Sequence, residues 1–313
     1  MRIWLVTPAP AGGHHGNRVT AERWATILRG LGHHVQVETD YQDQPADLLV
    51  ALHARRGAAA LRRFRARYPH RPVVLALTGT DLYPALDQTD IPVLELADRL
   101  VVLQPLATER VPAHLRDRVR VVFQSAPPPS AQPGRRDRFE VVQLAHLRPV
   151  KDPLLVAAAA RLLPDSSRIE ISHAGAALDP ELGELAARED RDNPRYRWHG
   201  DLPRHQALKL LAGGRLLVLS SRHEGGANAI TEALAAATPV LATHIPGTVG
   251  LLGPDYPGYF PTGDPARLAQ LLRRAETDSG WYRALRRHCA ARRRLVDPDR
   301  ERDSWERLLT GLA

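Results

Sequence analysis

Cysteine is nearly absent from this chain of 313 residues, in which Cys289 is the only one. One cysteine cannot form an internal disulfide, and neither His nor Cys occurs at zinc-ligand spacing, so a disulfide scaffold and a zinc finger are excluded. No apolar run approaches the ~20 residues that span a bilayer. The first residues, Met1-Arg2-Ile3-Trp4-Leu5-Val6, have the pattern of a strand rather than of a signal peptide. We therefore expect a cytoplasmic protein without stable membrane insertion.

Lysine and aromatic residues are also scarce. Only Lys151 and Lys209 of the 43 basic residues are lysine, and aromatics make up 5% of the chain, whereas the formal net charge is +8. The arginines are scattered, and no basic stripe is interleaved with aromatics, so we expect acidic small-molecule substrates and no nucleic acid. The densest basic run, Arg62 to Tyr68, could touch a membrane surface, although a solvated helix face is the favoured interpretation. A lysine kept in so arginine-rich a chain indicates a need for a compact ammonium group.

Strand and helix patterns alternate along the chain and predict two doubly wound α/β domains. We expect residues 1–126 to form the first domain, 127–137 a linker, 138–296 the second domain, and 297–313 a helix that could return to the first. The expected strands of the first domain are 3–7, 34–38, 48–52, 73–77, 99–103 and 119–123, with helices at 17–31, 57–68 and 105–114. In the second domain we expect strands at 139–144, 168–173, 196–199, 216–220, 239–242 and 258–260, and helices at 153–162, 180–189, 204–212 and 227–236. A helical tail should follow at 265–312, broken only at 296–298.

Two carboxylates, Glu224 and Glu232, are separated by seven residues where a predicted strand meets a predicted helix. In an open α/β sheet ligands bind at this edge, because helix N-termini converge there with unpaired N–H groups. The glycines between the carboxylates let the backbone approach a diphosphate, and each carboxylate can accept from sugar hydroxyls. A nucleotide sugar has both features.

The second domain resembles the donor domain of retaining GT-B glycosyltransferases. The resemblance rests on Glu224 to Glu232 with Ala233, on Thr238-Pro239-Val240, on a glycine loop at Gly247, on Gly200-Asp201, and on the loop Leu144 to Asp152. It implies an α/β fold of the GT-B type, in which two Rossmann-like domains face each other across a cleft. It also implies that the second domain binds the donor and the first binds the acceptor.

The resemblance assigns roles to particular residues. Glu232 is expected on the ribose, Glu224 on the donor hexose, and Lys151 on the β-phosphate, where charge develops as the nucleotide leaves. The family's usual arginine is His146 here, its first-domain histidine falls at Thr78, and a common glutamate is replaced by Gly250. The implied donor-binding residues are His146, Arg148, Lys151, Glu224, Gly225, Gly226, Ala227, Asn228, Glu232, Gly247 and Thr248. Without a functional role, Lys151 would be a solvated loop lysine, Glu224 a surface turn carboxylate and Glu232 an exposed helix residue.

Three first-domain segments, each after a predicted strand, narrow the resemblance to the selenosugar synthase family of selenoneine biosynthesis. They begin at Gly12, Ala51 and Thr78. That family implies a UDP-hexose donor, with UDP-N-acetylglucosamine as the expected one, and selenophosphate as the acceptor, giving a 1-seleno sugar, UDP and phosphate. The implied acceptor-binding residues are Gly12, Gly13, Asn17, Arg18, His53, Arg55, Arg56, Thr78 and Thr80. They form a donor-rich, cationic set suited to an oxyanion.

The catalytic candidates are Lys151, Glu224, His53 and Asp81. His53 could instead be a satisfied core histidine, Asp81 a turn acceptor or helix cap, and Arg18 the partner of Glu22 at helical spacing. No metal and no cofactor are expected, since no Asp-x-Asp site accompanies the donor motif. Open alternatives are a hexosyltransferase with a hydroxyl or amine acceptor, a non-catalytic nucleotide or polyanion binder, and a phosphorylase or epimerase.

Overall fold

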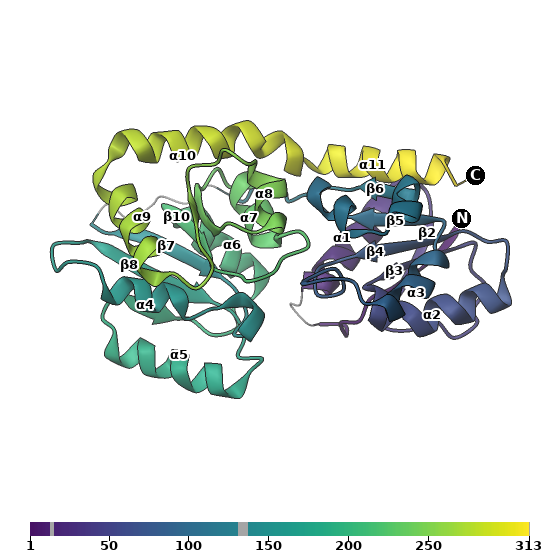
Figure 1. Cartoon of the computed structure of the whole chain (residues 1–313), viewed down its shortest axis with the longest axis horizontal. Coiled ribbons are helices and arrows are strands. Elements are labelled where there is room, and N and C mark those ends of the chain that lie inside the picture. The colour runs from purple at the N-terminus through teal and green to yellow at the C-terminus, as the bar shows by residue number, and fades with distance from the viewer. Residues whose placement is uncertain (13–15, 131–136, 313) are drawn as a thin grey trace. The chain divides into compact units, whose positions relative to one another are not determined.

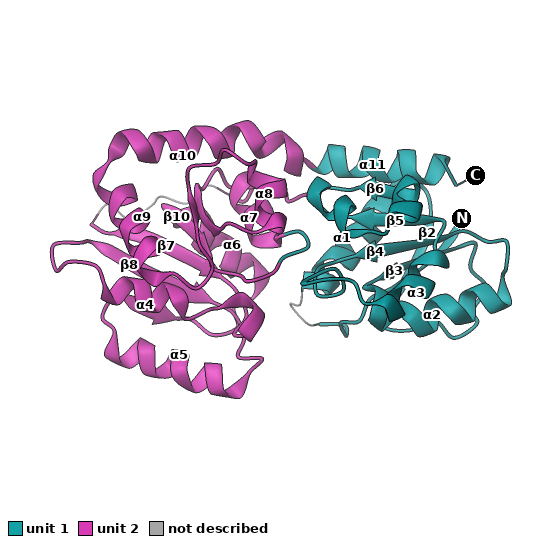
Figure 2. Ribbon diagram, in the orientation of Figure 1, with its two compact units in different colours: residues 1–124, 224–226, 298–313 teal, residues 125–223, 227–297 magenta. Residues whose placement is uncertain are grey.

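Six strands within the first 121 residues form one parallel sheet in the computed structural model, which describes residues 1–12, 16–130 and 137–312. The sheet belongs to the first of two units, made of residues 1–124, 224–226 and 298–313 and drawn in teal (Figure 2). The strands lie in the order β2-β1-β3-β4-β5-β6. They are β1 (Arg2–Val6), β2 (His34–Glu38), β3 (Leu48–Leu52), β4 (Val73–Leu77), β5 (Arg99–Val102) and β6 (Val119–Val121).

The helices of the first unit include one from the far end of the sequence. They are α1 (Gly16–Gly30), α2 (Ala54–Arg67), α3 (Ile91–Glu95) and α11 (Pro298–Thr310), with 3-10 helices at Gln88–Asp90, Pro105–Arg110 and Ala113–Arg118 (Figure 1). Successive β1 residues alternate between two cores, one containing Trp4 and the other Ile3, because a strand points its side chains to opposite faces. In the second core Trp305 of α11 packs edge-on against Trp24 of α1, with ring centroids 4.9 Å apart.

The second unit, residues 125–223 and 227–297, contains a second parallel sheet in the order β12-β11-β10-β7-β8-β9. Its strands are β7 (Phe139–Leu144), β8 (Ile169–Ala174), β9 (Tyr196–Trp198), β10 (Leu216–Leu219), β11 (Val240–Thr243) and β12 (Tyr259–Phe260). Its helices are α4 (Leu155–Arg161), α5 (Pro180–Asp192), α6 (Arg204–Gly213), α7 (Asn228–Ala235), α8 (Pro246–Leu252), α9 (Pro265–Thr277) and α10 (Ser279–Arg292), with 3-10 helices at Pro149–Lys151 and Arg293–Val296. The predicted pair of doubly wound α/β sheets is confirmed.

Two helix predictions were wrong in detail. The expected helix 105–114 is a pair of 3-10 helices, and Pro112, which has no N–H to continue a helix, stands between them. The C-terminal tail breaks before Pro298 as expected, but it is also interrupted at Asp278, whose carboxylate accepts from the Trp281 backbone N–H and so caps the start of α10. No helix among the described residues has both the length and the apolar character needed to cross a bilayer.

Candidate functional site

The order of strands reverses once in each sheet, between β1 and β3 in the first unit and between β7 and β10 in the second. Loops that leave the carboxyl ends of such neighbouring strands diverge to opposite faces of the sheet and open a crevice for ligands. The predicted donor residues Lys151 and Glu224 follow β7 and β10, and the predicted acceptor residues Gly12 and His53 follow β1 and β3. The sequence motifs therefore stand at the switch point of each sheet.

The loop that carries Lys151 is held from behind by the end of β10. Ser220 Oγ donates to the carbonyl oxygens of Lys151, at 3.0 Å, and Asp152, at 2.9 Å, and it accepts from Gln143 Nε2 at 3.2 Å. The Arg222 backbone N–H donates to the Val150 carbonyl at 2.8 Å. These bonds fix the main chain on either side of Lys151, which is half-buried.

Asp152 completes this loop in a left-handed conformation, with φ of 43°. Such a φ is uncommon for a residue with a side chain, and here the Arg222 guanidinium meets the Asp152 carboxylate at 2.8 Å. Sequence reasoning missed Gln143, Ser220 and Arg222 as supports of the loop. The available signal was a serine at the end of an otherwise apolar strand.

Glu224 and Glu232 are both largely buried, with exposed fractions of 9% and 8%, so neither is the solvated surface carboxylate that the structural alternative would require. Glu232 lies on α7, and its Oε1 is 2.8 Å from Nη1 of Arg204, the first residue of α6. A buried carboxylate is costly unless it is paired, and this ion pair also fixes the direction of the Glu232 side chain. Arg204 was not predicted as a site residue.

Gly225 and Gly226 belong to the first unit together with Glu224. A Cβ at position 225 would lie 2.4 Å from the Thr78 carbonyl oxygen, and one at position 226 would lie 2.5 Å from Leu103 Cβ. Because real Cβ atoms do not approach other heavy atoms this closely, glycine is required at both positions for packing. The predicted role of their N–H groups at a diphosphate stays a prediction.

His53 follows β3 with φ of 74°, a strained conformation for a residue with a side chain. It is the N-cap of α2, where its Nδ1 accepts from the Arg56 backbone N–H at 3.5 Å. Burial lowers the pKa of His53, which favours the neutral ring with its proton on Nε2. That N–H points to Thr80 Oγ1, 3.0 Å away, so the exposed Thr80 hydroxyl can direct its own hydrogen outwards.

Asp81 is fully buried, and its carboxylate organises the loop after β4. Oδ1 accepts from the backbone N–H groups of Thr78, at 3.0 Å, and Gly79, at 2.8 Å, while Oδ2 accepts from that of Ala54 at 2.9 Å. These bonds match the turn-acceptor alternative. The carboxylate therefore links the loop at Thr78 and Gly79 to Ala54, the first residue of α2.

The predicted cations of the first unit have different surroundings. Arg18 Nε is 2.7 Å from Glu22 Oε1, as the helical spacing suggested, and Arg55 binds Asp90 with two guanidinium nitrogens. Arg56 is exposed on the first turn of α2.

The remaining predicted residues lie in loops and first turns. Gly12 is exposed with φ of 78°, Asn17 is in the first turn of α1, and Gly13 lies outside the described residues. Arg148 and His146 belong to the Lys151 loop, Ala227 and Asn228 begin α7, and Gly247 and Thr248 begin α8. The Thr248 hydroxyl donates to the Thr243 carbonyl at 2.6 Å and so stabilises its own turn.

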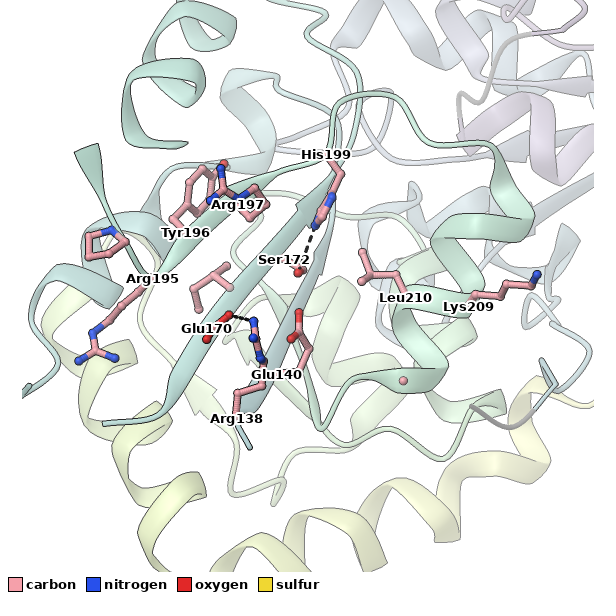
Figure 3. Close-up of a pocket in the computed structure, with 13 residues that line it drawn as sticks. Arg138, Glu140, Glu170, Ser172, Arg195, Tyr196, Arg197, His199, Lys209 and Leu210 are labelled. Carbon is pink, nitrogen blue, oxygen red and sulfur yellow. Dashed lines mark hydrogen bonds and ion pairs between the residues drawn. The ribbon is translucent and has the colours of Figure 1, made fainter. Parts of the chain in front are cut away.

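A cavity of about 410 Å³ lies beside β7, β8 and β9 and the last turns of α6 (Figure 3). Its wall carries Glu140, Glu170, Ser172 and His199, and His199 Nε2 lies 3.2 Å from Ser172 Oγ. None of the described residues predicted to bind the donor lines this cavity. Within the described part of the chain, no three His, Cys, Asp or Glu side chains gather as around a metal ion.

Known proteins resemble this chain in sequence and in fold. Residues 130–295, more than half of the chain, match the family model described as Glycosyl transferases group 1. The chain is similar in structure to Anabaena HepE in complex with UDP-glucose, with 16% identity, a TM-score of 0.78 and coverage of 99% of this chain and 100% of that chain. It is also similar to the sucrose-phosphate synthase of Thermosynechococcus elongatus, with 17% identity, a TM-score of 0.77 and coverage of 99% and 98%. The predicted GT-B fold is confirmed.

Proposed function

The chain belongs to the group 1 glycosyl transferases, and on that premise we propose that it transfers a hexose from a UDP-sugar to a small anionic acceptor. The donor assignment is supported above all by the loops that follow β7 and β10 at the switch point of the second sheet, where Ser220 and Arg222 hydrogen-bond to the main chain of the Lys151 loop. The solved structures of HepE, which contain UDP, UDP-glucose or UDP and glucose, support a uridine nucleotide.

Catalysis in this proposal comes from charge that is in place before the reaction. As the bond between the sugar C1 and the β-phosphate oxygen breaks, the oxygen keeps the electron pair and UDP becomes more negative. The Lys151 ammonium and the backbone N–H groups of Gly225, Gly226 and Ala227 stabilise that charge more in the transition state than in the ground state. Glu232, oriented by Arg204, accepts from the ribose hydroxyls, and Glu224 accepts from the hexose.

We further propose that the acceptor is selenophosphate and that the hexose is N-acetylglucosamine. Selenium forms a bond to the sugar C1 as UDP leaves, and water then cleaves the P–Se bond to release phosphate and the 1-seleno sugar. The outward Thr80 hydroxyl and the exposed Arg56 support an oxyanion ligand in the first unit. A selenium nucleophile that is already ionised needs no base, which is compatible with a neutral His53.

Mass spectrometry of a mixture of the protein, UDP-N-acetylglucosamine and selenophosphate tests the proposal directly. We expect the 1-seleno sugar, UDP and phosphate in equal amounts. Transfer to an alcohol or amine but not to selenophosphate would show instead that the protein is a conventional hexosyltransferase. Binding of UDP-sugar without UDP release under any acceptor would leave a nucleotide-binding protein.

The donor residues are tested by Glu232→Gln, with Glu181→Gln on an exposed position of α5 as the matched control. Loss of a charged hydrogen bond to the ribose and of the pair with Arg204 should weaken UDP binding by about 10- to 100-fold. The control should bind UDP as the wild type does. Equal affinities for all three proteins in calorimetry would contradict the assignment of Glu232.

A further inference from the structure

A buried histidine and tyrosine lie directly behind the loop that carries Lys151. His173 on β8 has no exposed surface, and Tyr196 on β9 is 1% exposed. His173 Nδ1 is 2.6 Å from the Tyr196 hydroxyl, and His173 Nε2 is 2.8 Å from the carbonyl oxygen of Ala145, the first residue after β7. The three groups form one chain from an edge strand to the start of the loop.

The direction of each hydrogen bond in this chain is fixed by chemistry. A carbonyl oxygen can only accept a hydrogen bond, so His173 Nε2 must be protonated and donates to the Ala145 oxygen. In the neutral ring Nδ1 is then an acceptor, and the Tyr196 hydroxyl donates to it. Burial lowers the pKa of His173 to about 4 and raises that of Tyr196, so both side chains are neutral near pH 7 and the directions persist.

The loop makes further close contacts at the same place. A Cβ on Gly175 would lie 1.9 Å from the Ala145 oxygen, so the segment after β8 touches the loop as closely as backbone can. His146 Nδ1 accepts from the Ala176 N–H at 3.0 Å, and the Leu147 N–H donates to the Ala176 carbonyl at 2.9 Å. The first residues of the loop are thus held against the segment that follows β8, and its last residues are held against the segment that follows β10.

We propose that His173 and Tyr196 are positioning residues for the donor diphosphate: they fix the Ala145 carbonyl and so set the course of the main chain from Ala145 to Lys151. Neither residue contacts the ligand. Movement of the Ala145 carbonyl would leave a buried imidazole N–H without its acceptor, which disfavours other loop conformations. This inference rests on the proposed function, because it takes the loop as the site of the diphosphate.

Two amide substitutions at His173 distinguish the effect of its hydrogen bond to Ala145 from the effect of removing the imidazole ring. The amide nitrogen of Gln reaches about as far as Nε2 of His, whereas that of Asn reaches only about as far as Nδ1. His173→Gln should therefore keep the donor to Ala145, and His173→Asn should lose it, although both are neutral. Ser172→Ala is the control, because the neighbouring Ser172 hydroxyl faces His199 in the cavity instead of the loop (Figure 3).

The measurement is the calorimetric affinity of each folded variant for UDP and for uridine, which lacks the diphosphate. We expect His173→Asn to weaken UDP binding about tenfold, the equivalent of one buried hydrogen bond, with uridine binding unchanged. His173→Gln and Ser172→Ala should stay within about threefold of the wild type for both ligands. Tyr196→Phe, which removes one oxygen, should give a smaller loss confined to UDP, and it tests the same chain if His173→Asn does not fold.

Equal losses for UDP and uridine would show that His173 only maintains the fold, and unchanged UDP affinity in His173→Asn and Tyr196→Phe would show that the chain does not position the loop. Either result overturns the inference while the proposed function stands. A wild-type protein that binds neither UDP nor a UDP-sugar would instead refute the proposed function, and the positioning role with it.

Discussion

The buried imidazole of His173 should make the protein sensitive to acid. Its pKa is about 4 in the folded chain and 6.5 in the unfolded reference, because burial disfavours the charged ring. Between these values the unfolded chain binds the proton more tightly, so stability falls as pH decreases. This contribution is complete above pH 6.5 and is lost as pH falls towards 4. The full shift corresponds to about 3 kcal/mol, of which about 1 kcal/mol is lost by pH 5.5.

The comparison uses wild type and His173→Gln in urea denaturation at pH 7.5, 5.5 and 4.5. Glutamine does not titrate, whereas the other histidines whose pKa burial lowers, His33, His53 and His199, are present in both proteins and cancel. From pH 7.5 to 5.5 the wild type should lose about 1 kcal/mol more free energy of unfolding than the variant. Parallel losses across the pH range would refute the assignment of a buried neutral imidazole at position 173.

Three substitutions test the packing that positions the site. Gly175→Ala should destabilise the second unit by about 1–3 kcal/mol in urea, because the new methyl would overlap the Ala145 carbonyl, whereas Gly30→Ala, with open space around it, should be neutral or slightly stabilising. Glu301→Ala should lower the free energy of unfolding by about 3 kcal/mol, because this buried carboxylate on α11 accepts hydrogen bonds from the Arg23 guanidinium and the Trp24 indole N–H on α1. A loss under 1 kcal/mol would contradict that role. Asp81→Asn should cost about 1–3 kcal/mol by turning an amide NH₂ towards backbone donors, and an unchanged urea midpoint would show that the loop does not depend on the carboxylate.

Local sequence patterns were sufficient for the strands and insufficient for several helices. Strands β3 and β4 are buried at every position, and such continuous apolar runs are typical of parallel strands covered on both faces. The segment 105–114 lacks that kind of signal, and Pro112 decides its outcome by ending one 3-10 helix before the next. The interruption of the tail at Asp278 also depends only on nearby residues, because Asp278 caps α10. The tail is so basic and polar that this one capping residue did not stand out in the sequence.

The sequence by itself determined the two α/β units, the family, and the positions of Lys151 and Glu224 after strands β7 and β10, because each depends on the order and periodicity of nearby residues. Only the tertiary structure decided what holds those positions. Ser220 lies 69 residues from Lys151 in the chain, and Tyr196 lies 23 from His173. Hydrogen bonds between such residues form when strands become neighbours in the sheet, and no local pattern encodes which polar side chain will meet which carbonyl.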